Sequence, residues 1–201
     1  MDTQEFYYTI EETAVTEYKD RGSRFIAYAF PIATADDFKA RLNEMKKEHP
    51  KATHHCFAYR LGLDGNSFRV SDAGEPSGTA GKPILGQIDS KQLTDILVVV
   101  VRYFGGTLLG VPGLINAYRS ATSLVLQLTP VVQKAVEREY DIQFDYTKMN
   151  EVMTVVKQYN CQVRKQEMQL FCHMILGVPA SREEEVVYKL KEIRNVELKK
   201  T

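Results

Sequence analysis

The chain has 201 residues and carries 26 Lys and Arg against 26 Asp and Glu, so its formal net charge at pH 7 is zero. This balance excludes a broadly basic nucleic-acid coat, and 44 % hydrophobic with 26 % charged residues excludes a disordered, collagenous or coiled-coil chain. Three scattered cysteines and an N-terminus without an apolar signal stretch predict a cytoplasmic protein with reduced thiols and no membrane insertion.

The chain begins with strand-like stretches at residues 6–10 and 25–30. A helix is then predicted to open at Thr34, because Thr34 and Asp37 fit a capping box. Apolar residues recur on one face of this helix until His49 and the following proline end it. The start of the chain is therefore mixed in character, with strands and a helix in succession.

Two further strands are predicted over residues 56–59 and 67–70, joined by a turn that contains Asp64 and Gly65. Residues 96–101 are a continuous β-branched run, which is typical of a central strand covered on both faces. The spacing of apolar residues then predicts a closing helix, so this half is α+β. The residues that mark the helix are Leu114, Tyr118, Ala121 and Val125.

The pattern changes after Leu128-Thr129-Pro130, and we place a domain boundary near residue 133. Two domains are expected, 1–133 and 134–201. The second has the element order βαββαβ, the ferredoxin-like split arrangement in which two helices cover one face of an antiparallel sheet. Its expected strands are 140–144, 161–165, 170–176 and 196–198, and its expected helices are 149–159 and 181–193.

A glycine-rich segment, residues 72–85, is the first candidate site. Small residues let backbone N–H groups approach an anion, and Lys82 would add a full positive charge. The segment is not a Walker A loop, because Pro76 and Pro83 occupy positions where that motif needs glycine and a hydroxyl residue. It is either a phosphate site or a structural turn in which a hydroxyl caps the next helix. The candidate contacts are Ser77, Gly78, Thr79, Gly81 and Lys82.

Arg102 follows the buried strand and needs a partner for its charge. Its guanidinium suits a substrate phosphate or a nucleic-acid backbone, and an internal ion pair with Asp72 or Glu75 is the alternative. Tyr103 would either stack on a base or belong to the core. The second candidate site therefore comprises Arg102, Tyr103, Gly105 and Gly106.

The run His54-His55-Cys56 raises the possibility of a metal site or a cysteine nucleophile. In a strand His54 and Cys56 share a face while His55 points away, so two ligands at most converge where a structural zinc site needs about four. We predict no metal site, and a buried strand cysteine is usually inert. Carboxylates on a loop more often cap or pair than act as acid and base. We therefore expect His54, Asp72 and Glu75 to support the loop or to form ion pairs.

Four motifs occur in order along the first 130 residues, and with them the chain resembles the YigZ/IMPACT family. The remainder resembles the small C-terminal domain of bacterial YigZ proteins. The motifs are Asp20-Arg21-Gly22-Ser23-Arg24-Phe25-Ile26, His54-His55-Cys56-Phe57-Ala58-Tyr59, Glu75-Pro76-Ser77-Gly78-Thr79-Ala80-Gly81-Lys82-Pro83-Ile84-Leu85 and Val99-Val100-Val101-Arg102-Tyr103-Phe104-Gly105-Gly106.

The resemblance implies a first domain with the fold of a ribosomal-protein domain, domain IV of elongation factor G and GHMP kinases. It implies a second, ferredoxin-like domain similar to the small domains of elongation factor G. Bacterial members of the family are thought to bind RNA or the ribosome. The eukaryotic IMPACT protein restrains the kinase that senses amino-acid starvation by competing for its activator.

We therefore expect a non-catalytic, cytoplasmic translation regulator that binds RNA, the ribosome or a translation-regulatory protein, without cofactor or metal. The likeness to GHMP kinases leaves an enzyme acting on a phosphorylated small molecule, through the glycine-rich loop, as the alternative. A protein–protein adaptor is a third reading, which would need an exposed apolar patch rather than a basic one.

Three positions depart from the family pattern. Leu108 stands where a basic residue is usual, Pro112 where glycine is usual, and Asn116 where arginine is usual. Two positive charges are thus missing, and each lost phosphate contact removes about one unit of salt dependence. We expect weaker RNA binding than in other members. Ala73 also stands where a second acidic residue is common, which weakens a carboxylate-pair mechanism.

Overall fold

The computed structural model describes residues 4–201. The chain forms two units, each with its own hydrophobic core. Tyr7–Gln133 form the first unit, and Lys134–Thr201 with residues 4–6 form the second. Residues 4–6 fall with the second unit, where the Glu5 carbonyl oxygen accepts a hydrogen bond from the Val136 amide (2.8 Å). Residues 1–3, at the start of the first predicted domain, lie outside the described residues.

A five-stranded antiparallel sheet in the order β2-β3-β6-β4-β5 forms the framework of the first unit. β1 and β7 pair separately in a two-stranded sheet. The strands are β1 (Phe6–Ile10), β2 (Ala14–Asp20), β3 (Ser23–Pro31), β4 (His54–Leu61), β5 (Ser67–Ser71), β6 (Ile96–Tyr103) and β7 (Val131–Ala135), and the helices are α1 (Ala35–Glu48), α2 (Gly81–Ser90) and α3 (Gly110–Leu128).

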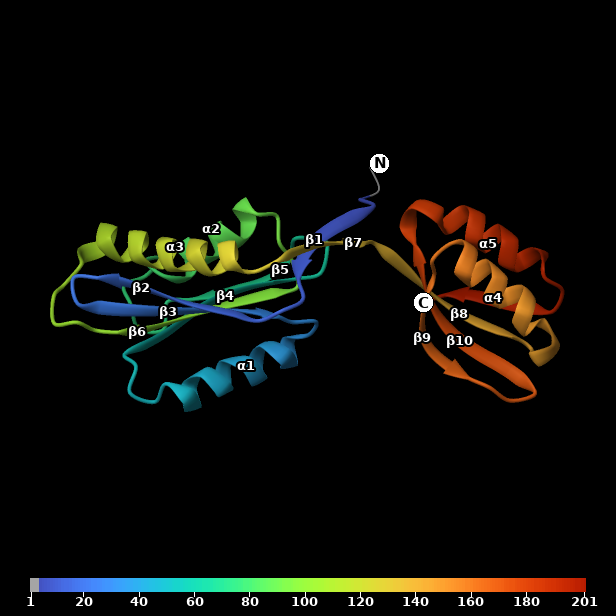
Figure 1. Cartoon of the computed structure of the whole chain (residues 1–201), viewed down its shortest axis with the longest axis horizontal. Helices are drawn as coiled ribbons and strands as arrows, with labels where there is room; N and C mark the ends of the chain where they lie inside the picture. The colour runs from blue at the N-terminus through green and yellow to red at the C-terminus, as the bar shows by residue number, and fades with distance from the viewer. Residues whose placement is uncertain (1–3) are drawn as a thin grey trace. The chain divides into compact units, whose positions relative to one another are not determined.

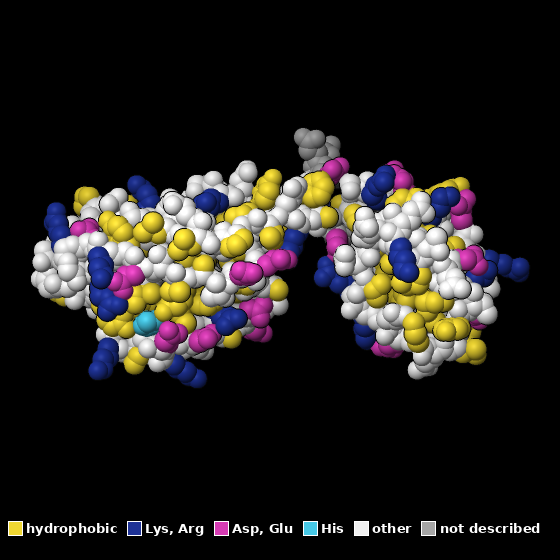
Figure 2. Space-filling model, in the orientation of Figure 1, with side chains coloured by type: hydrophobic (Ala, Val, Ile, Leu, Met, Phe, Trp, Pro, Cys, Tyr) yellow, Lys and Arg dark blue, Asp and Glu magenta, His cyan; other side chains and the backbone are white. Residues whose placement is uncertain are grey.

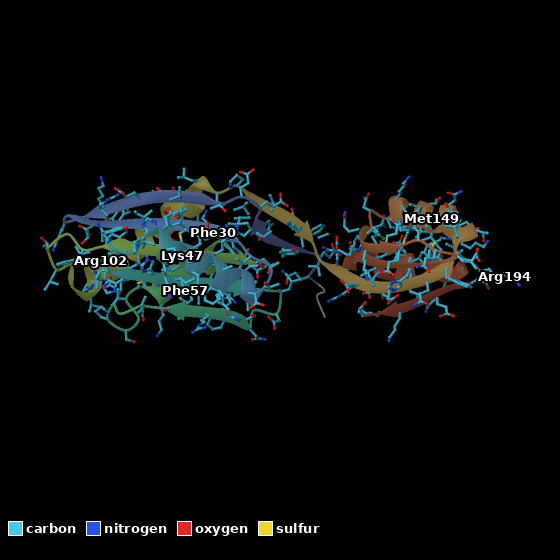
Figure 3. All side chains as sticks on the ribbon, turned by 90° about the horizontal axis from the view of Figure 1, so that it is seen from below. Phe30, Lys47, Phe57, Arg102, Met149 and Arg194 are labelled. Carbon is cyan, nitrogen blue, oxygen red and sulfur yellow. The ribbon has the colours of Figure 1, made fainter. Side chains whose placement is uncertain are left out.

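The central strand β6 is covered on both faces, as its continuous apolar run predicts, because alternate side chains point to opposite faces of a sheet. Ile96, Val98 and Val100 pack into the core under α2 and α3, and the intervening residues pack into the core under α1. Figure 1 shows α2 and α3 over one face of the sheet and α1 over the other. Figure 3 labels Phe30 and Phe57, which belong to the core on the α1 side.

The predicted capping box of α1 is confirmed. The Thr34 hydroxyl oxygen accepts a hydrogen bond from the Asp37 amide (3.1 Å), and the Asp37 carboxylate accepts one from the Thr34 amide (2.8 Å). The helix ends at His49, as predicted. The sequence pattern does not specifically predict β2. This strand is only half covered and contains the charged residues Glu17, Lys19 and Asp20.

The second unit has the predicted βαββαβ order and a sheet in the order β11-β8-β10-β9. α4 and α5 cover one face, where Ile142, Val152, Met174 and Leu190 are fully buried (Figure 1). Asn160 closes α4 with a positive φ of 53°. The elements are β8 (Glu137–Asp145), α4 (Met149–Gln158), β9 (Gln162–Glu167), β10 (Phe171–Pro179), α5 (Glu183–Glu192) and β11 (Val196–Lys200). Within residues 4–201, no helix combines the length and hydropathy needed to cross a membrane.

Candidate functional site

The glycine-rich loop folds around the side chain of Asp72. One carboxylate oxygen accepts hydrogen bonds from the amides of Ala80 (2.9 Å) and Gly81 (2.8 Å), and the other accepts one from the amide of Gly78 (2.8 Å). Partial burial opposes ionisation of this carboxyl group, but the three amide bonds outweigh it, and the pKa of Asp72 lies below its usual value. The amides that could have received a phosphate are thus bonded to an anion of the chain itself.

The other residues of the loop have different surroundings. The Thr79 hydroxyl is buried and donates to the Pro76 carbonyl oxygen (2.7 Å). Gly81 packs so closely on β5 that a Cβ would lie 2.8 Å from the Ser71 amide nitrogen. Ser77 and Lys82 are exposed. Of the five predicted contacts of the loop, these are the two whose side chains are exposed.

Arg102 is buried and forms an ion pair with Glu75, one of the two partners left open by the sequence. Nη1 donates to Glu75 Oε1 over 2.6 Å, and Arg102 and Glu75 are only 5 % and 8 % exposed. Nη2 donates to the Ser23 hydroxyl (3.4 Å), while Nε has no hydrogen-bond partner within residues 4–201. The guanidinium also lies over the rings of Phe25 and Phe104. Its charge is therefore largely satisfied inside the unit.

Tyr118 of α3 completes this buried network. It is fully buried, and its hydroxyl donates to the same Glu75 oxygen (2.7 Å). Burial and the neighbouring Cys56 and Glu75 raise the pKa of Tyr118, so it stays protonated. The helical spacing of apolar residues predicts Tyr118 only as part of the core face of the helix. The available signal was that a buried tyrosine hydroxyl needs a hydrogen-bond partner.

His54 and Cys56 lie on the same face of β4 as expected, but they do not form a nucleophilic pair. The Cys56 thiol lies 3.0 Å from the Asp72 carbonyl oxygen and 3.3 Å from the Tyr118 hydroxyl. Burial raises the pKa of Cys56 to about 12, so the group is a thiol and not a thiolate. His54 Nδ1 is instead 2.9 Å from the Ala73 carbonyl oxygen. Among residues 4–201, no three metal-ligating side chains come together.

The structure does not bring Tyr103 to the side of the sheet that holds Arg102. Neighbouring strand residues face opposite ways, and Tyr103 packs against the core under α1. Its hydroxyl lies 2.9 Å from His49 Nδ1, and the other ring nitrogen of His49 lies 2.8 Å from the Tyr28 hydroxyl. Tyr103 thus belongs to a separate network at the end of α1.

Gly105 belongs to the motif that ends at Gly106, and it lies in close contact with the motif of residues 20–26. A Cβ at Gly105 would lie only 1.9 Å from the carbonyl carbon of Gly22, in the turn between β2 and β3. The Gly105 amide donates to the Ser23 hydroxyl (3.2 Å). Gly106 has a positive φ of 86° and is exposed. These glycines fix the course of the backbone next to Arg102.

A cavity of about 430 Å³ lies over the Arg102 network, beside the start of α3. Its polar floor consists of His54, Glu75 and Arg102. In Figure 3 the label of Arg102 lies apart from those of Phe30 and Phe57. His54 Nε2 is 3.8 Å from Glu75 Oε1. The remaining lining is mostly apolar and is formed by Thr53, Pro76, Phe104, Leu108, Leu109, Gly110, Val111 and Leu114.

Several apolar side chains at this cavity are exposed to solvent. Phe104 is 47 % exposed, Leu108 82 % and Val111 51 %. Leu108 is one of the three departures from the family pattern, and Pro112 and Asn116, the other two, are exposed on α3. On the face shown in Figure 2, Lys and Arg side chains are dispersed among Asp and Glu. The cavity therefore presents an apolar rim around a buried, charge-paired floor.

Comparisons with known proteins identify the family. The model of the Impact N-terminal domain matches residues 21–126. An IMPACT family member from Haemophilus influenzae is 37 % identical over 174 residues, which cover 85 % of this chain and 84 % of that protein. IMPACT family member YigZ from Escherichia coli is 34 % identical over 182 residues, 90 % of this chain and 88 % of that protein.

More distant and structural matches agree. Protein IMPACT from Xenopus laevis is 34 % identical over 94 residues, 45 % of this chain and 30 % of that protein. A crystal structure described as that of a hypothetical protein aligns over 98 % of this chain and 97 % of its own, with a TM-score of 0.77 and 30 % identity. The match to the domain model and the long alignments to bacterial relatives together show that the chain belongs to the IMPACT family and is homologous to bacterial YigZ.

Proposed function

We propose that the chain is a non-catalytic regulatory protein of translation that binds a protein component of the translation machinery through the apolar cavity of its first unit. The observation that carries the proposal is the exposed rim of Phe104, Leu108 and Val111. Exposed apolar side chains that line a hollow are typical of protein interaction sites. The link to translation rests on membership of the IMPACT family.

Binding to RNA phosphate receives less support from the geometry. The amides of Gly78, Ala80 and Gly81 are bonded to Asp72, and Arg102 is paired with Glu75. Ser77 and Lys82 are the exposed groups of the loop that remain for a phosphate of RNA or the ribosome. The alternative of an enzyme acting on a phosphorylated small molecule would require the same amides.

The fold likenesses implied by the family form part of this proposal. We infer that the first unit has the fold of domain IV of elongation factor G and of the ribosomal-protein domain. We also infer that the second unit is ferredoxin-like. Two units related to domains of a translation factor would suit a protein that binds the same machinery. An experimental structure of the chain compared with those domains would test the likeness.

The binding proposal is tested by sedimentation with crude and with salt-washed Escherichia coli ribosomes, and with isolated ribosomal RNA, over a salt series. Leu108→Lys distinguishes protein binding from RNA binding. In an apolar protein contact the new charge would weaken binding, whereas next to RNA phosphate it would strengthen binding. We expect association with ribosomes that changes little with salt and falls about tenfold or more in Leu108→Lys. Lys82→Ala should bind normally.

Leu128→Lys is the matched control, because Leu128 is 64 % exposed at the far end of α3, the helix that begins two residues after Leu108. Arg102→Ala is a poor probe, since it leaves Glu75 buried and unpaired at a cost of about 3–5 kcal/mol. Association that weakens steeply with salt and strengthens in Leu108→Lys would replace the proposal by RNA binding. Absence of association with both ribosome preparations would overturn it.

A further inference from the structure

We infer that the group that enters the cavity is a phenol, so that a tyrosine side chain of the partner anchors the complex. This inference rests on the proposed function, because it specifies the partner as a protein with an exposed tyrosine. Tyrosine, tryptophan and arginine are the side chains that most often dominate protein interfaces. The floor and the walls of the cavity discriminate among these three.

The charge of the floor excludes a charged anchor such as arginine. Glu75 and Arg102 are joined at 2.6 Å, and their side chains are only 3 % and 6 % exposed. Their charges therefore cancel within the floor. A cation or an anion brought to this point would lose its hydration and would find no unpaired opposite charge in the floor. Burial of an unpaired charge costs several kcal/mol. The anchor is thus a neutral group.

The hydrogen-bonding groups of the floor favour a hydroxyl over an indole. A carbonyl oxygen can only accept, so His54 Nδ1 donates to Ala73 (2.9 Å), and Nε2 is the ring nitrogen left to meet a ligand. Arg102 lines the cavity, and its Nη1 and Nη2 atoms, which carry two N–H groups each, donate one hydrogen bond each to Glu75 and Ser23, so donors remain. A hydroxyl donates and accepts at once, whereas an indole N–H only donates. The floor is complementary to a hydroxyl.

The walls require an apolar body behind that hydroxyl. Phe104, Leu108, Val111 and Leu114 line the cavity, whose volume of about 430 Å³ lies within the usual range of small-ligand sites. An aromatic ring fits within such a space at low entropic cost and packs on Phe104. A phenol combines the ring and the hydroxyl in one rigid group.

The inference is tested on the full chain with five small probes of similar size, which differ in the polar group. They are p-cresol, toluene, p-toluate, 4-methylbenzylammonium and 3-methylindole. Binding is followed by the NMR shifts of the Leu109, Gly110 and Val111 amides. We expect p-cresol to bind about tenfold more tightly than each of the other four. Leu108→Lys should weaken p-cresol binding, and Leu128→Lys should leave it unchanged.

Each other outcome overturns the inference. Stronger binding of p-toluate or of the ammonium would show that the floor selects a charge. Equal or stronger binding of 3-methylindole or toluene would show that the hydroxyl is not recognised. No shift with p-cresol up to about 10 mM would exclude a phenol site of the affinity expected for so small a ligand. The probes need no ribosome, so the failure of this inference is distinct from the failure of sedimentation.

Discussion

The carboxylate of Asp72 stabilises the entrance to α2 from a distance of several residues. α2 begins without a side-chain cap on Ala80, and its first amides would otherwise lack acceptors. Asp72, which directly follows β5, supplies that acceptor. Its negative charge also interacts favourably with the positive end of the helix dipole. A single ionised side chain thus holds the loop and the helix start together.

This arrangement predicts a stability that depends on pH in a defined direction. The pKa of Asp72 is lowered from its usual 3.8, so the stabilisation is complete above about pH 4 and is lost as the pH falls through the folded-state pKa. Asp72→Asn should lower the unfolding free energy by about 2–3 kcal/mol at pH 7, because an amide cannot accept these bonds equally well.

Urea unfolding of Asp72→Asn and of the parent chain at pH 7 and pH 3 measures this effect. The difference between the two proteins should shrink at the lower pH. Asp36→Asn is the control, since its side chain is 87 % exposed and the substitution should change stability by less than about 0.5 kcal/mol. A difference that stays constant with pH would show that ionisation of Asp72 does not support the fold.

The polar residues around Arg102 show what the sequence can predict at this scale. It indicates that Arg102 needs a partner for its charge, and it leaves open a phosphate of a ligand or an ion pair with Asp72 or Glu75. It could not choose between them, because the choice depends on how residues 72–81 fold in three dimensions. Once Asp72 is held by amides, Glu75 is left to reach Arg102. The role of Tyr118 was beyond prediction for the same reason, since it comes from an element 43 residues away from Glu75.

At the scale of elements, the contact between Gly105 and Gly22 fixes the end of β6 against the turn of the β2–β3 hairpin. The backbone atoms of Gly22 and Ser23 lie within 2.2 Å of the place that a Gly105 Cβ would occupy. No rearrangement of a side chain can relieve such a clash. The end of β6 could not approach this turn with any other residue.

Gly105→Ala should therefore lower the unfolding free energy by about 3 kcal/mol or more. Gly86→Ala is the matched control in the same unit, because a Cβ at Gly86 meets nothing within 4 Å. Gly86 lies inside α2, so alanine there should raise stability by about 1 kcal/mol. Chemical denaturation of the two variants checks both signs. Equal effects in both variants would contradict the packing account.

Strong local signals explain which elements could be predicted. The continuous apolar run of β6, the capping box of α1 and the helical spacing in α3 and α4 are each contained in a few consecutive residues. β2 has no such signal, because Glu17, Lys19 and Asp20 are uncommon in strands. It forms a strand because it pairs with β3 along its whole length, and that pairing is a tertiary effect.

At the scale of the whole molecule, the cores of the two units share no residues. The first unit has a core on each face of its sheet, and the second unit has a single core that includes Met174. Both units therefore contain what a domain needs to fold, since a separate core is the physical definition of one. A substitution in one core should act on the stability of that unit.

Met174→Ala should lower the stability of the second unit by about 2–4 kcal/mol, because the side chain is fully buried. Leu97→Ala, in the first unit, is the reciprocal control. Amide hydrogen exchange of the full chain reports on both units at once. We expect protection to fall in β8 and β10 for the first variant and in β3 and β6 for the second. A uniform loss across the chain in both variants would show that the units unfold together.

The self-bonded loop at Asp72 also bears on how such a segment diverges. Three backbone amides already converge on the Asp72 carboxylate. Replacement of this aspartate by a small residue would leave the three amides available to bind a free anion. Such a receptor would have no need of a new loop or new glycines. In this fold, a single substitution would therefore separate a structural turn from a phosphate-binding loop.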